Sequence, residues 1–127
     1  MTRRNSPDRP LTRLQQAILD ILWARGPATA DAIREGLQAR HPLKDSSVRT
    51  LLRRLEAQGH VSHRVDGKVF VYQAAVKPGR MAARAVRQVI DRFCSGSVEQ
   101  FLLGMVDERV LSPEEIQRLA RKIRGAK

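Results

Sequence analysis

Hydroxyl-bearing and basic side chains share one face of a segment that its apolar residues predict to be helical. In residues 46–56 the apolar positions recur at i, i+3, i+4 and i+7, which is the spacing of one helix face. The opposite face and its flanks carry the candidate functional residues Ser46, Ser47, Arg49, Thr50, Arg53 and Arg54. A helix of this kind fits the major groove of DNA, where arginine can donate two bonds to guanine.

The helical projection divides these six residues into two groups. Arg53, Ser46 and Thr50 lie opposite the apolar stripe. We expect Arg53 to contact guanine, and Ser46 and Thr50 to contact bases or thymine methyl groups. The flanking residues, which suit phosphate contacts, are Ser47, Arg49 and Arg54. The alternative interpretation is a solvated surface, because the outer face of an amphipathic helix is commonly polar without binding anything.

A β-hairpin is predicted directly after this helix. The segments Val61–Val65 and Val69–Tyr72 alternate around Asp66-Gly67, which favours two strands joined by a type I′ turn. Arg64 and Lys68 then lie near the tip, where they can reach the sugar-phosphate backbone or the minor groove. Charges on an edge strand that discourage aggregation explain these two residues equally well.

The elements before and around the candidate helix predict its setting. Thr12 with Gln15 has the spacing of a capping box and starts a first helix, and Thr29 can cap a short second helix. Three short helices followed by a hairpin are the order of a winged helix-turn-helix domain. We therefore predict a mainly α fold with a small β-hairpin, with this domain at residues 11–76 after a basic N-terminal tail at residues 1–10.

Residues 80–127 are predicted to form three amphipathic helices behind a linker at Lys77-Pro78-Gly79. The start of the last helix is marked by Ser112 as N-cap and Glu115 three residues later. A helical segment of this size is marginal as an isolated core, so we expect a helical dimerisation region whose apolar faces meet a second copy of the chain. The candidate dimerisation residues are Val86, Val89, Ile90, Phe93, Phe101, Leu102, Met105, Ile116 and Leu119.

Composition narrows the class of partner. The 127 residues include 24 Lys plus Arg against 13 Asp plus Glu, a formal net charge of +11. Such a charge indicates a polyanionic partner, nucleic acid first and an anionic membrane surface second. No apolar run approaches the ~18 residues that cross a bilayer, and no signal-peptide pattern follows the basic N-terminus. We therefore expect a cytoplasmic protein without membrane insertion.

The histidines and the cysteine are not spaced as catalytic or metal-binding residues are. His60 and His63 are three apart in a predicted strand, which points them to opposite faces, and His41 lies in a loop. Cys94 is the single cysteine, so it can form neither an internal disulfide nor a CxxC site. Nucleophile-elbow, zinc-protease and phosphate-loop motifs are missing from the sequence. We expect neither an enzyme nor a metal site nor a cofactor.

The order and spacing of four segments resemble the penicillinase-repressor (BlaI/MecI/CopY) family of winged-helix transcriptional regulators. These segments are residues 11–23, 47–59, 66–72 and 111–115, and the likeness runs over about residues 11–125. The resemblance implies a homodimer whose N-terminal domains bind a dyad DNA operator and block transcription. It also implies that the C-terminal helices form the dimer.

The resemblance assigns roles to individual residues. The family's contact residues in the third helix fall on Ser46, Ser47 and Thr50, with Ser46 in place of the usual lysine. Arg49 is the candidate to supply the missing charge. The family's basic wing residue falls on Lys68.

Regulation is implied by the resemblance alone. In members that control β-lactam resistance, a sensor-linked protease cleaves the dimer helices, and the nearest position here is Gln100-Phe101. The spacing of Phe101 and Leu102 also fits an ordinary core role. Copper-responsive members carry paired cysteines near the C-terminus, so the lone Cys94 disfavours copper sensing.

Two other functions fit the same residues. A nucleoid-associated or RNA-binding protein would use the positive charge without sequence preference. A winged-helix domain can also present its third helix to a protein partner. A sequence-specific repressor is favoured because a basic helix face and a basic hairpin tip occur together.

Overall fold

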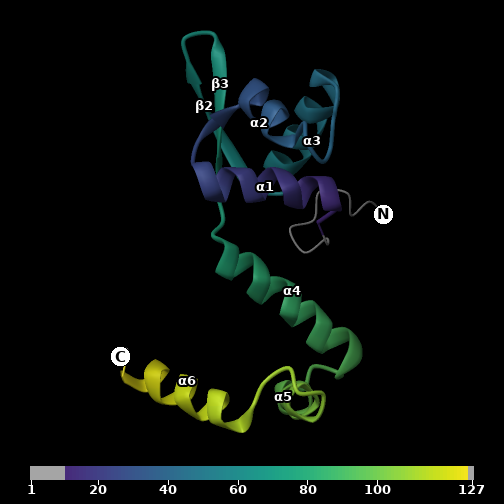
Figure 1. The fold of residues 1–127 in the computed structure, drawn as a ribbon, viewed down its shortest axis with the longest axis vertical. Helices are drawn as coiled ribbons and strands as arrows, with labels where there is room; N and C mark the ends of the chain where they lie inside the picture. The colour runs from purple at the N-terminus through teal and green to yellow at the C-terminus, as the bar shows by residue number, and fades with distance from the viewer. Residues whose placement is uncertain (1–10, 126–127) are drawn as a thin grey trace. The chain divides into compact units, whose positions relative to one another are not determined.

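The structure is a computed structural model that describes residues 11–125 of the chain. These residues form six helices and three strands (Figure 1). The elements are α1 (Arg13–Arg25), β1 (Ala28–Thr29), α2 (Ala30–Leu37), α3 (Asp45–Ala57), β2 (Val61–Asp66), β3 (Val69–Ala74), α4 (Pro78–Phe93), α5 (Val98–Asp107) and α6 (Pro113–Gly125). The chain divides into two compact units, Met1–Ala85 and Val86–Lys127. The predicted basic tail at residues 1–10 lies outside the described residues.

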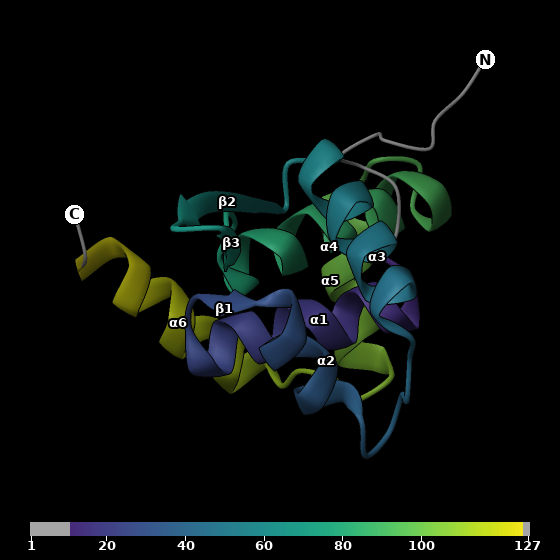
Figure 2. The ribbon, with the colours of Figure 1, turned by 90° about the horizontal axis from the view of Figure 1, so that it is seen from above.

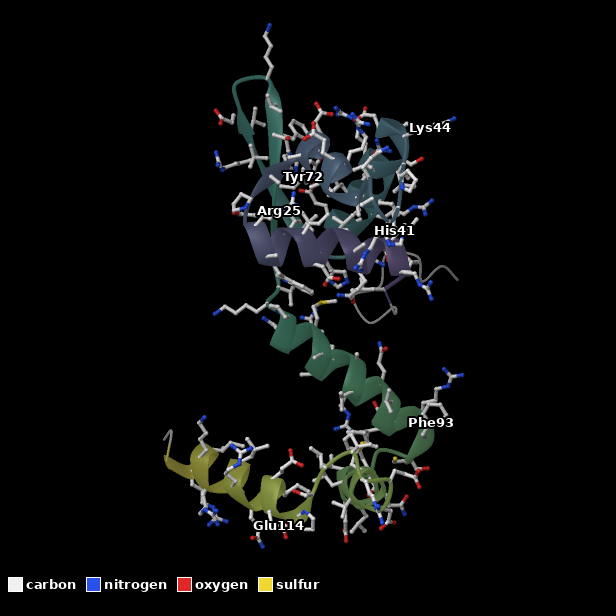
Figure 3. All side chains as sticks on the ribbon, in the orientation of Figure 1. Arg25, His41, Lys44, Tyr72, Phe93 and Glu114 are labelled. Carbon is white, nitrogen blue, oxygen red and sulfur yellow. The ribbon has the colours of Figure 1, made fainter. Side chains whose placement is uncertain are left out.

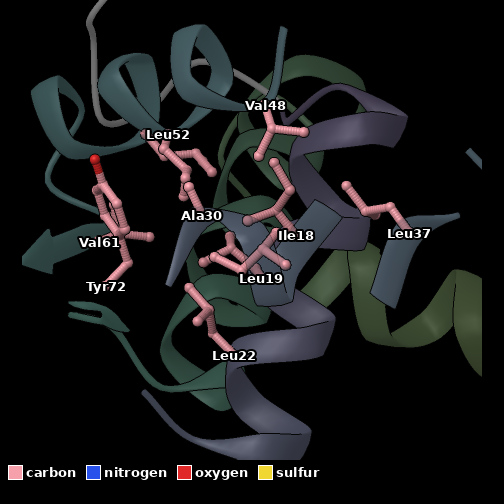
Figure 4. Close-up of a cluster of buried hydrophobic side chains, with 11 residues drawn as sticks. Ile18, Leu19, Leu22, Ala30, Leu37, Val48, Leu52, Val61 and Tyr72 are labelled. Atoms are coloured by element: carbon pink, nitrogen blue, oxygen red, sulfur yellow. The ribbon is translucent and has the colours of Figure 1, made fainter. Parts of the chain in front are cut away.

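The core of the first unit is aliphatic, and its three helices and its sheet all contribute to it (Figure 4). Along α3, Val48, Leu52 and Leu55 are fully buried, which confirms the apolar stripe predicted from their spacing. Helices α1, α2 and α3 pack against one another, and the β2–β3 hairpin extends to one side of them (Figures 1 and 2). The other buried members of the core are Ile18, Leu19, Leu22, Ala30, Ile33, Leu37, Val61 and Tyr72.

Side-chain caps determine where the helices begin. The Thr12 hydroxyl accepts from the Gln15 backbone N–H at 3.1 Å, and the Gln15 side-chain oxygen accepts from the Thr12 N–H at 3.0 Å. The same reciprocal pair joins Ser112 and Glu115 at the start of α6, at 3.1 and 2.9 Å. Thr29 caps α2 through its hydroxyl. Each of these caps satisfies a backbone donor at a helix start, and all three confirm the sequence prediction.

The sheet has a third strand that the sequence did not reveal. Antiparallel pairing gives the strand order β1-β3-β2, with Ala28 opposite Tyr72 and Thr29 opposite Val71. A two-residue strand is too short to show alternation, so its pattern carried no signal. Its consequence is that the start of α2 lies beside β3.

The turn at the tip of the hairpin differs from the type I′ turn predicted at Asp66-Gly67. Asp66 pairs with Val69, so the two loop residues are Gly67 and Lys68. Gly67 has a φ of 66°, whereas Lys68 is not among the described residues with positive φ. Positive φ at only the first loop residue fits a type II′ turn, which requires glycine there and accepts lysine next. The shift by one residue places Lys68 in the turn itself.

Helix α4 begins at Pro78, so the segment predicted as a linker forms its first turn. Proline is favoured in a first turn because its missing N–H has no helical partner there. The Trp23 indole N–H donates to the Val76 carbonyl at 2.9 Å, and Met81 packs against the core of the first unit. The start of α4 therefore belongs to the first unit.

His60 is fully buried, and neither of its ring nitrogens has a hydrogen-bond partner. Burial disfavours a charged imidazole, and the Arg84 charge adds to this effect, so the pKa of His60 is lowered from its ordinary value. The neutral ring therefore packs as part of the core. The sequence-based expectation of a structural histidine fits this environment.

We expect the free energy of unfolding to fall as the pH drops below 6.5, the ordinary pKa of histidine. The reason is that the unfolded chain binds a proton that folded His60 resists, and one such group contributes at most about 1.4 kcal/mol per pH unit. Urea unfolding at about pH 7.5 and about pH 5.5 measures the difference. A His60→Leu variant should lose less stability on acidification than the parent chain. Equal losses in the two chains would show that His60 is not the titrating group.

The second unit has amphipathic helices with little enclosed core. Ile90 is buried, whereas α5 and the described part of α6 contain no buried residue. Arg87 donates to the Asp91 carboxylate at 3.0 Å and to the Gly96 carbonyl at 3.2 Å, which ties the end of α4 to the turn after it. Within residues 11–125, none of the helices has the length and apolar character needed to cross a membrane.

Candidate nucleic-acid interface

Helix α3 presents the predicted contact residues on its outer side. Ser46, Arg49, Arg53 and Arg54 are exposed, whereas Ser47 and Thr50 are half-buried. The helix starts after Lys44, whose side chain makes no capping hydrogen bond, and Figure 3 shows Lys44 at this end of α3. Burial of one face against α1 and α2 thus leaves the polar face free for a ligand.

The arginines of α3 differ in their partners. Arg49 Nε donates to the Asp45 carboxylate at 2.8 Å, and this contact raises the pKa of Arg49. Among the described residues, no carboxylate lies within 4.0 Å of Arg53 or Arg54. An exposed i, i+4 ion pair contributes little free energy, so a phosphate can take the place of Asp45 at small cost. Arg53 and Arg54 have no ion pair to give up before they bind a ligand.

A histidine of the hairpin contacts a carboxylate of α3. His63 Nδ1 lies 2.7 and 2.8 Å from the two carboxylate oxygens of Glu56. The imidazole stacks on Phe70 with a centroid distance of 4.2 Å, and Tyr72 lies at 5.7 Å. His63, Phe70 and Tyr72 share the sheet face that turns toward Glu56 of α3. This contact fixes the direction in which the hairpin leaves the domain.

A hollow of about 160 Å³ lies between α3, the start of α2 and the hairpin, and we name it the wing hollow. Arg49 and Lys68 both line it, so the structure brings together one predicted contact residue of the helix and one of the hairpin. Arg64 pairs with Val71 on the opposite sheet face and lies apart from them. The remaining lining residues are Thr29, Ala30, Asp31, Val69, Phe70 and Tyr72.

Two cations beside the amino end of α2 suit a phosphate group. Thr29, which caps α2, and the first helical residues Ala30 and Asp31 line the same hollow as Arg49 and Lys68. Free N–H groups at a helix start and nearby basic side chains both favour an anion. The Asp31 carboxylate also lines the hollow and repels an anion, so the attraction for a phosphate comes from Arg49 and Lys68.

Sequence reasoning missed Glu56 and Thr29 as parts of this region. Glu56 continues the polar side of α3 but bonds to His63, seven residues away, through the fold-back of β2. Thr29 reaches the hairpin only because β1 pairs with β3. Neither relation has a periodic signal in the sequence. In the part of the chain that the structure describes, no group of three or more His, Cys, Asp or Glu residues could hold a metal ion.

Comparison with known proteins decides the class of the molecule. The family model described as penicillinase repressor matches residues 11–125. The chain belongs to the penicillinase repressor family. This match confirms the resemblance found in four segments of the sequence, and the family is one of transcriptional repressors rather than enzymes.

Two relatives of this penicillinase repressor family member are 22% and 26% identical to it over the matched residues. The methicillin resistance regulatory protein MecI of Mammaliicoccus sciuri is 26% identical over 102 residues, covering 80% of this chain and 83% of that protein. The penicillinase repressor of Bacillus licheniformis is 22% identical, covering 80% of both chains.

Solved structures support the winged-helix fold. The transcriptional regulator Tm0710 from Thermotoga maritima has a TM-score of 0.51 at 18% identity, covering 91% of this chain and 72% of its own. The structure of the hsRosR-S4 complex also has a TM-score of 0.51, at 17% identity and with 97% and 95% coverage. The predicted fold class, a winged helix-turn-helix domain followed by helices, is confirmed for this family member.

The predicted dimerisation residues of this penicillinase repressor family member differ in exposure. Val86, Val89, Phe93 and Leu119 are exposed, with Phe93 at 73%, while Ile90 is buried. The half-buried members are Phe101, Leu102, Met105 and Ile116. Val98 and Ile123, which lie on the predicted apolar helix faces, are exposed too, and so are Leu103 and Val110, which were not predicted. The second unit thus exposes more apolar surface than the sequence pattern indicated.

The position predicted for regulatory cleavage lies at the start of α5. The Gln100 backbone N–H donates to the Ser97 hydroxyl at 3.1 Å, so this bond helps to cap the helix. Gln100 is exposed and Phe101 is half-buried. The backbone at Gln100-Phe101 is helical and would have to open locally before it entered a protease as an extended chain.

Proposed function

We propose that the chain is a sequence-specific transcriptional repressor that binds a dyad DNA operator as a homodimer in the cytoplasm. The observation that carries this proposal is the exposed hydroxyl and arginine face of α3, with Lys68 of the hairpin beside it at the wing hollow. Membership of a repressor family and a formal net charge of +11 support it.

The contacts follow from the chemistry of each side chain. Arg53 donates to guanine in the major groove, and Ser46 and Thr50 face neighbouring bases. The residues assigned to phosphates are Ser47, Arg49, Arg54, Arg64 and Lys68. Lys68 in the turn and Arg49 on α3 hold the backbone from two sides, and the Glu56–His63 contact maintains the distance between them.

We assign DNA binding to residues 11–76 and dimerisation to residues 80–127. The division of the chain into two compact units and the exposed apolar side chains of the second unit support this assignment. A second copy would cover Val86, Val89, Phe93 and Leu119, together with Leu103 and Ile123. The two recognition helices would then contact half-sites one helical turn, or a multiple of it, apart.

Release from DNA would follow cleavage at Gln100-Phe101 by a sensor-linked protease. The location in α5, within the region assigned to dimerisation, supports this step, because a cut there separates α6 and most of α5 from α4. The dimer would lose apolar contacts and the repressor would lose its second half-site contact.

The test is fluorescence anisotropy with a dyad fragment from the upstream region of the chain's own gene and a scrambled duplex, at two salt concentrations. A preference for the dyad fragment of ~1,000-fold or more, kept at the higher salt, supports a specific repressor. Equal binding that weakens together as salt rises would identify a non-specific, nucleoid-associated protein instead. Absence of binding to either duplex would favour a protein partner for α3.

A further inference from the structure

Both carboxylates of α3 are hydrogen-bonded to another side chain. Asp45 accepts from Arg49 Nε at 2.8 Å. The two carboxylate oxygens of Glu56 lie 2.7 and 2.8 Å from His63 Nδ1. An ionised carboxylate can only accept, so Nδ1 carries the hydrogen of this contact. Arg53 lies between the two carboxylates in the sequence and has no ion pair in the described part of the chain.

Arg53 is the residue of α3 that can pair with Glu56 when His63 does not. It lies three residues before Glu56, and side chains at that spacing are neighbours on a helix surface. No other residue of α3 three or four positions from Glu56 is basic. The pKa of Tyr72 is raised by burial first and by the Glu56 charge next, while the charges of Arg49 and Arg53 lower it. Arg53 and Glu56 therefore both act on the same side chain of the hairpin.

The hairpin holds His63 in position to contact Glu56. The imidazole is stacked on Phe70, with a centroid distance of 4.2 Å and an angle of 13° between the rings. Because this stacking already orders the ring, its contact with Glu56 costs little further side-chain entropy. A pair with Arg53 would have to order a long, exposed side chain instead. His63 is therefore the favoured partner of Glu56.

We propose that His63 is a positioning residue: by occupying the Glu56 carboxylate, it keeps Arg53 unpaired and free to reach the DNA. The consequence for DNA binding rests on the proposed function, since it matters only if Arg53 contacts guanine. A residue of β2 then controls an arginine of α3, which gives the hairpin a role in addition to its own contacts with DNA.

The first arm of the experiment needs no DNA. His63→Phe removes the donor and keeps an aromatic ring that can stack on Phe70. In the full-length chain, the freed carboxylate should then pair with Arg53, and NMR relaxation of the Arg53 Nε–H group should show a more ordered side chain. Adding Glu56→Gln should return Arg53 to its original mobility, because the amide has no charge. Arg54 is not three or four residues from Glu56, so it is the internal control and should not change.

The second arm measures operator binding by anisotropy. The readout is the ratio of the affinities for the operator and for the same duplex with a substituted G·C pair in each half-site. A pair at this spacing contributes about 1.4-fold to 2.3-fold per copy, so the ratio should fall about twofold to fivefold in a His63→Phe homodimer. Glu56→Gln should restore the ratio. A displaced hairpin alone would weaken both duplexes alike, and Glu56→Gln would not reverse that loss.

The outcomes separate this inference from the proposed function. Unchanged mobility of Arg53 in His63→Phe would overturn the inference, whatever the DNA results. If Arg53 becomes ordered but Arg53→Ala leaves the affinity ratio unchanged, the assignment of Arg53 to guanine fails and His63 still positions Arg53. If Arg53→Ala lowers the ratio and His63→Phe does not, the inference is wrong and the proposed function stands. A lowered ratio that Glu56→Gln does not restore would also contradict the inference.

Discussion

Replacing Arg53 by alanine is expected to weaken operator binding by roughly 30-fold to 20,000-fold. A bidentate arginine–guanine contact contributes about 1–3 kcal/mol of discrimination, and a homodimer makes the contact twice. Arg53 is exposed and has no carboxylate partner within 4.0 Å among residues 11–125, so its removal breaks no ion pair in the described fold. The measurement is anisotropy with the operator and with the same duplex carrying a substituted G·C pair in each half-site.

Arg54→Ala is the matched control, because it removes the same charge from the next residue of α3. Arg54 lies on the flank assigned to phosphates, so its loss should weaken binding to all duplexes alike and reduce the salt dependence by about one ion per copy. Both variants should unfold within about 0.5 kcal/mol of the parent chain, because both positions are exposed. If Arg53→Ala also weakened all duplexes equally, its assignment to a base would be wrong.

Local patterns allowed the elements of the fold to be predicted, because their causes lie within one helical turn. The pair Thr12 with Gln15 and the pair Ser112 with Glu115 are each three residues apart, and both form the expected caps. The stripe of α3 follows from helical periodicity in the same way: Val48, Leu52 and Leu55 are buried, and Leu51 is half-buried at its edge. The sequence alone therefore predicts which side of α3 is buried and which side carries the polar residues.

Contacts between residues far apart in the sequence could not be predicted, because helical or strand periodicity does not connect such residues. The buried amide of Gln15 lies 3.5 Å from that of Gln58, 43 residues away, although the sequence showed Gln15 only as a capping residue. The contact of Glu56 with His63 needs the exact path of the chain between α3 and β2. The wing hollow combines the start of α2 with the hairpin tip, and the pairing of β1 with β3 creates it.

The hairpin shows which part of a turn the sequence can predict. The predicted strands, Val61–Val65 and Val69–Tyr72, already left Lys68 near the tip, and the structure adds that Gly67 and Lys68 are the two loop residues. In the structure Lys68 is a turn residue that lines the wing hollow with Arg49. The electrostatic role of Lys68 stays a prediction, and its place beside α3 depends on the fold of the hairpin against Glu56.

Removing the residues after Ala85 is expected to give a monomer that binds the operator about 100-fold to 10,000-fold more weakly. Two linked half-site contacts gain an effective concentration that a single domain lacks, which is the source of the factor. The cut at Ala85 keeps Met81 and the bond from Trp23 to Val76, so the first unit retains its core. A cut after Gly79 would remove Met81 and confound stability with assembly.

The measurements are mass by light scattering and affinity by anisotropy, with thermal unfolding to establish that the first unit is folded. In the full chain, Leu119→Glu places a charge on an apolar side chain that is 43% exposed, and it should shift the dimer toward monomer. Gln117→Glu adds the same charge two positions earlier, beside the apolar stripe of α6, and should leave the mass unchanged. A truncated chain that remained a dimer with full affinity would contradict the assignment of dimerisation to the C-terminal helices. If Leu119→Glu were monomeric but bound as tightly as the parent chain, the half-sites would be occupied independently and the second copy would add nothing to affinity.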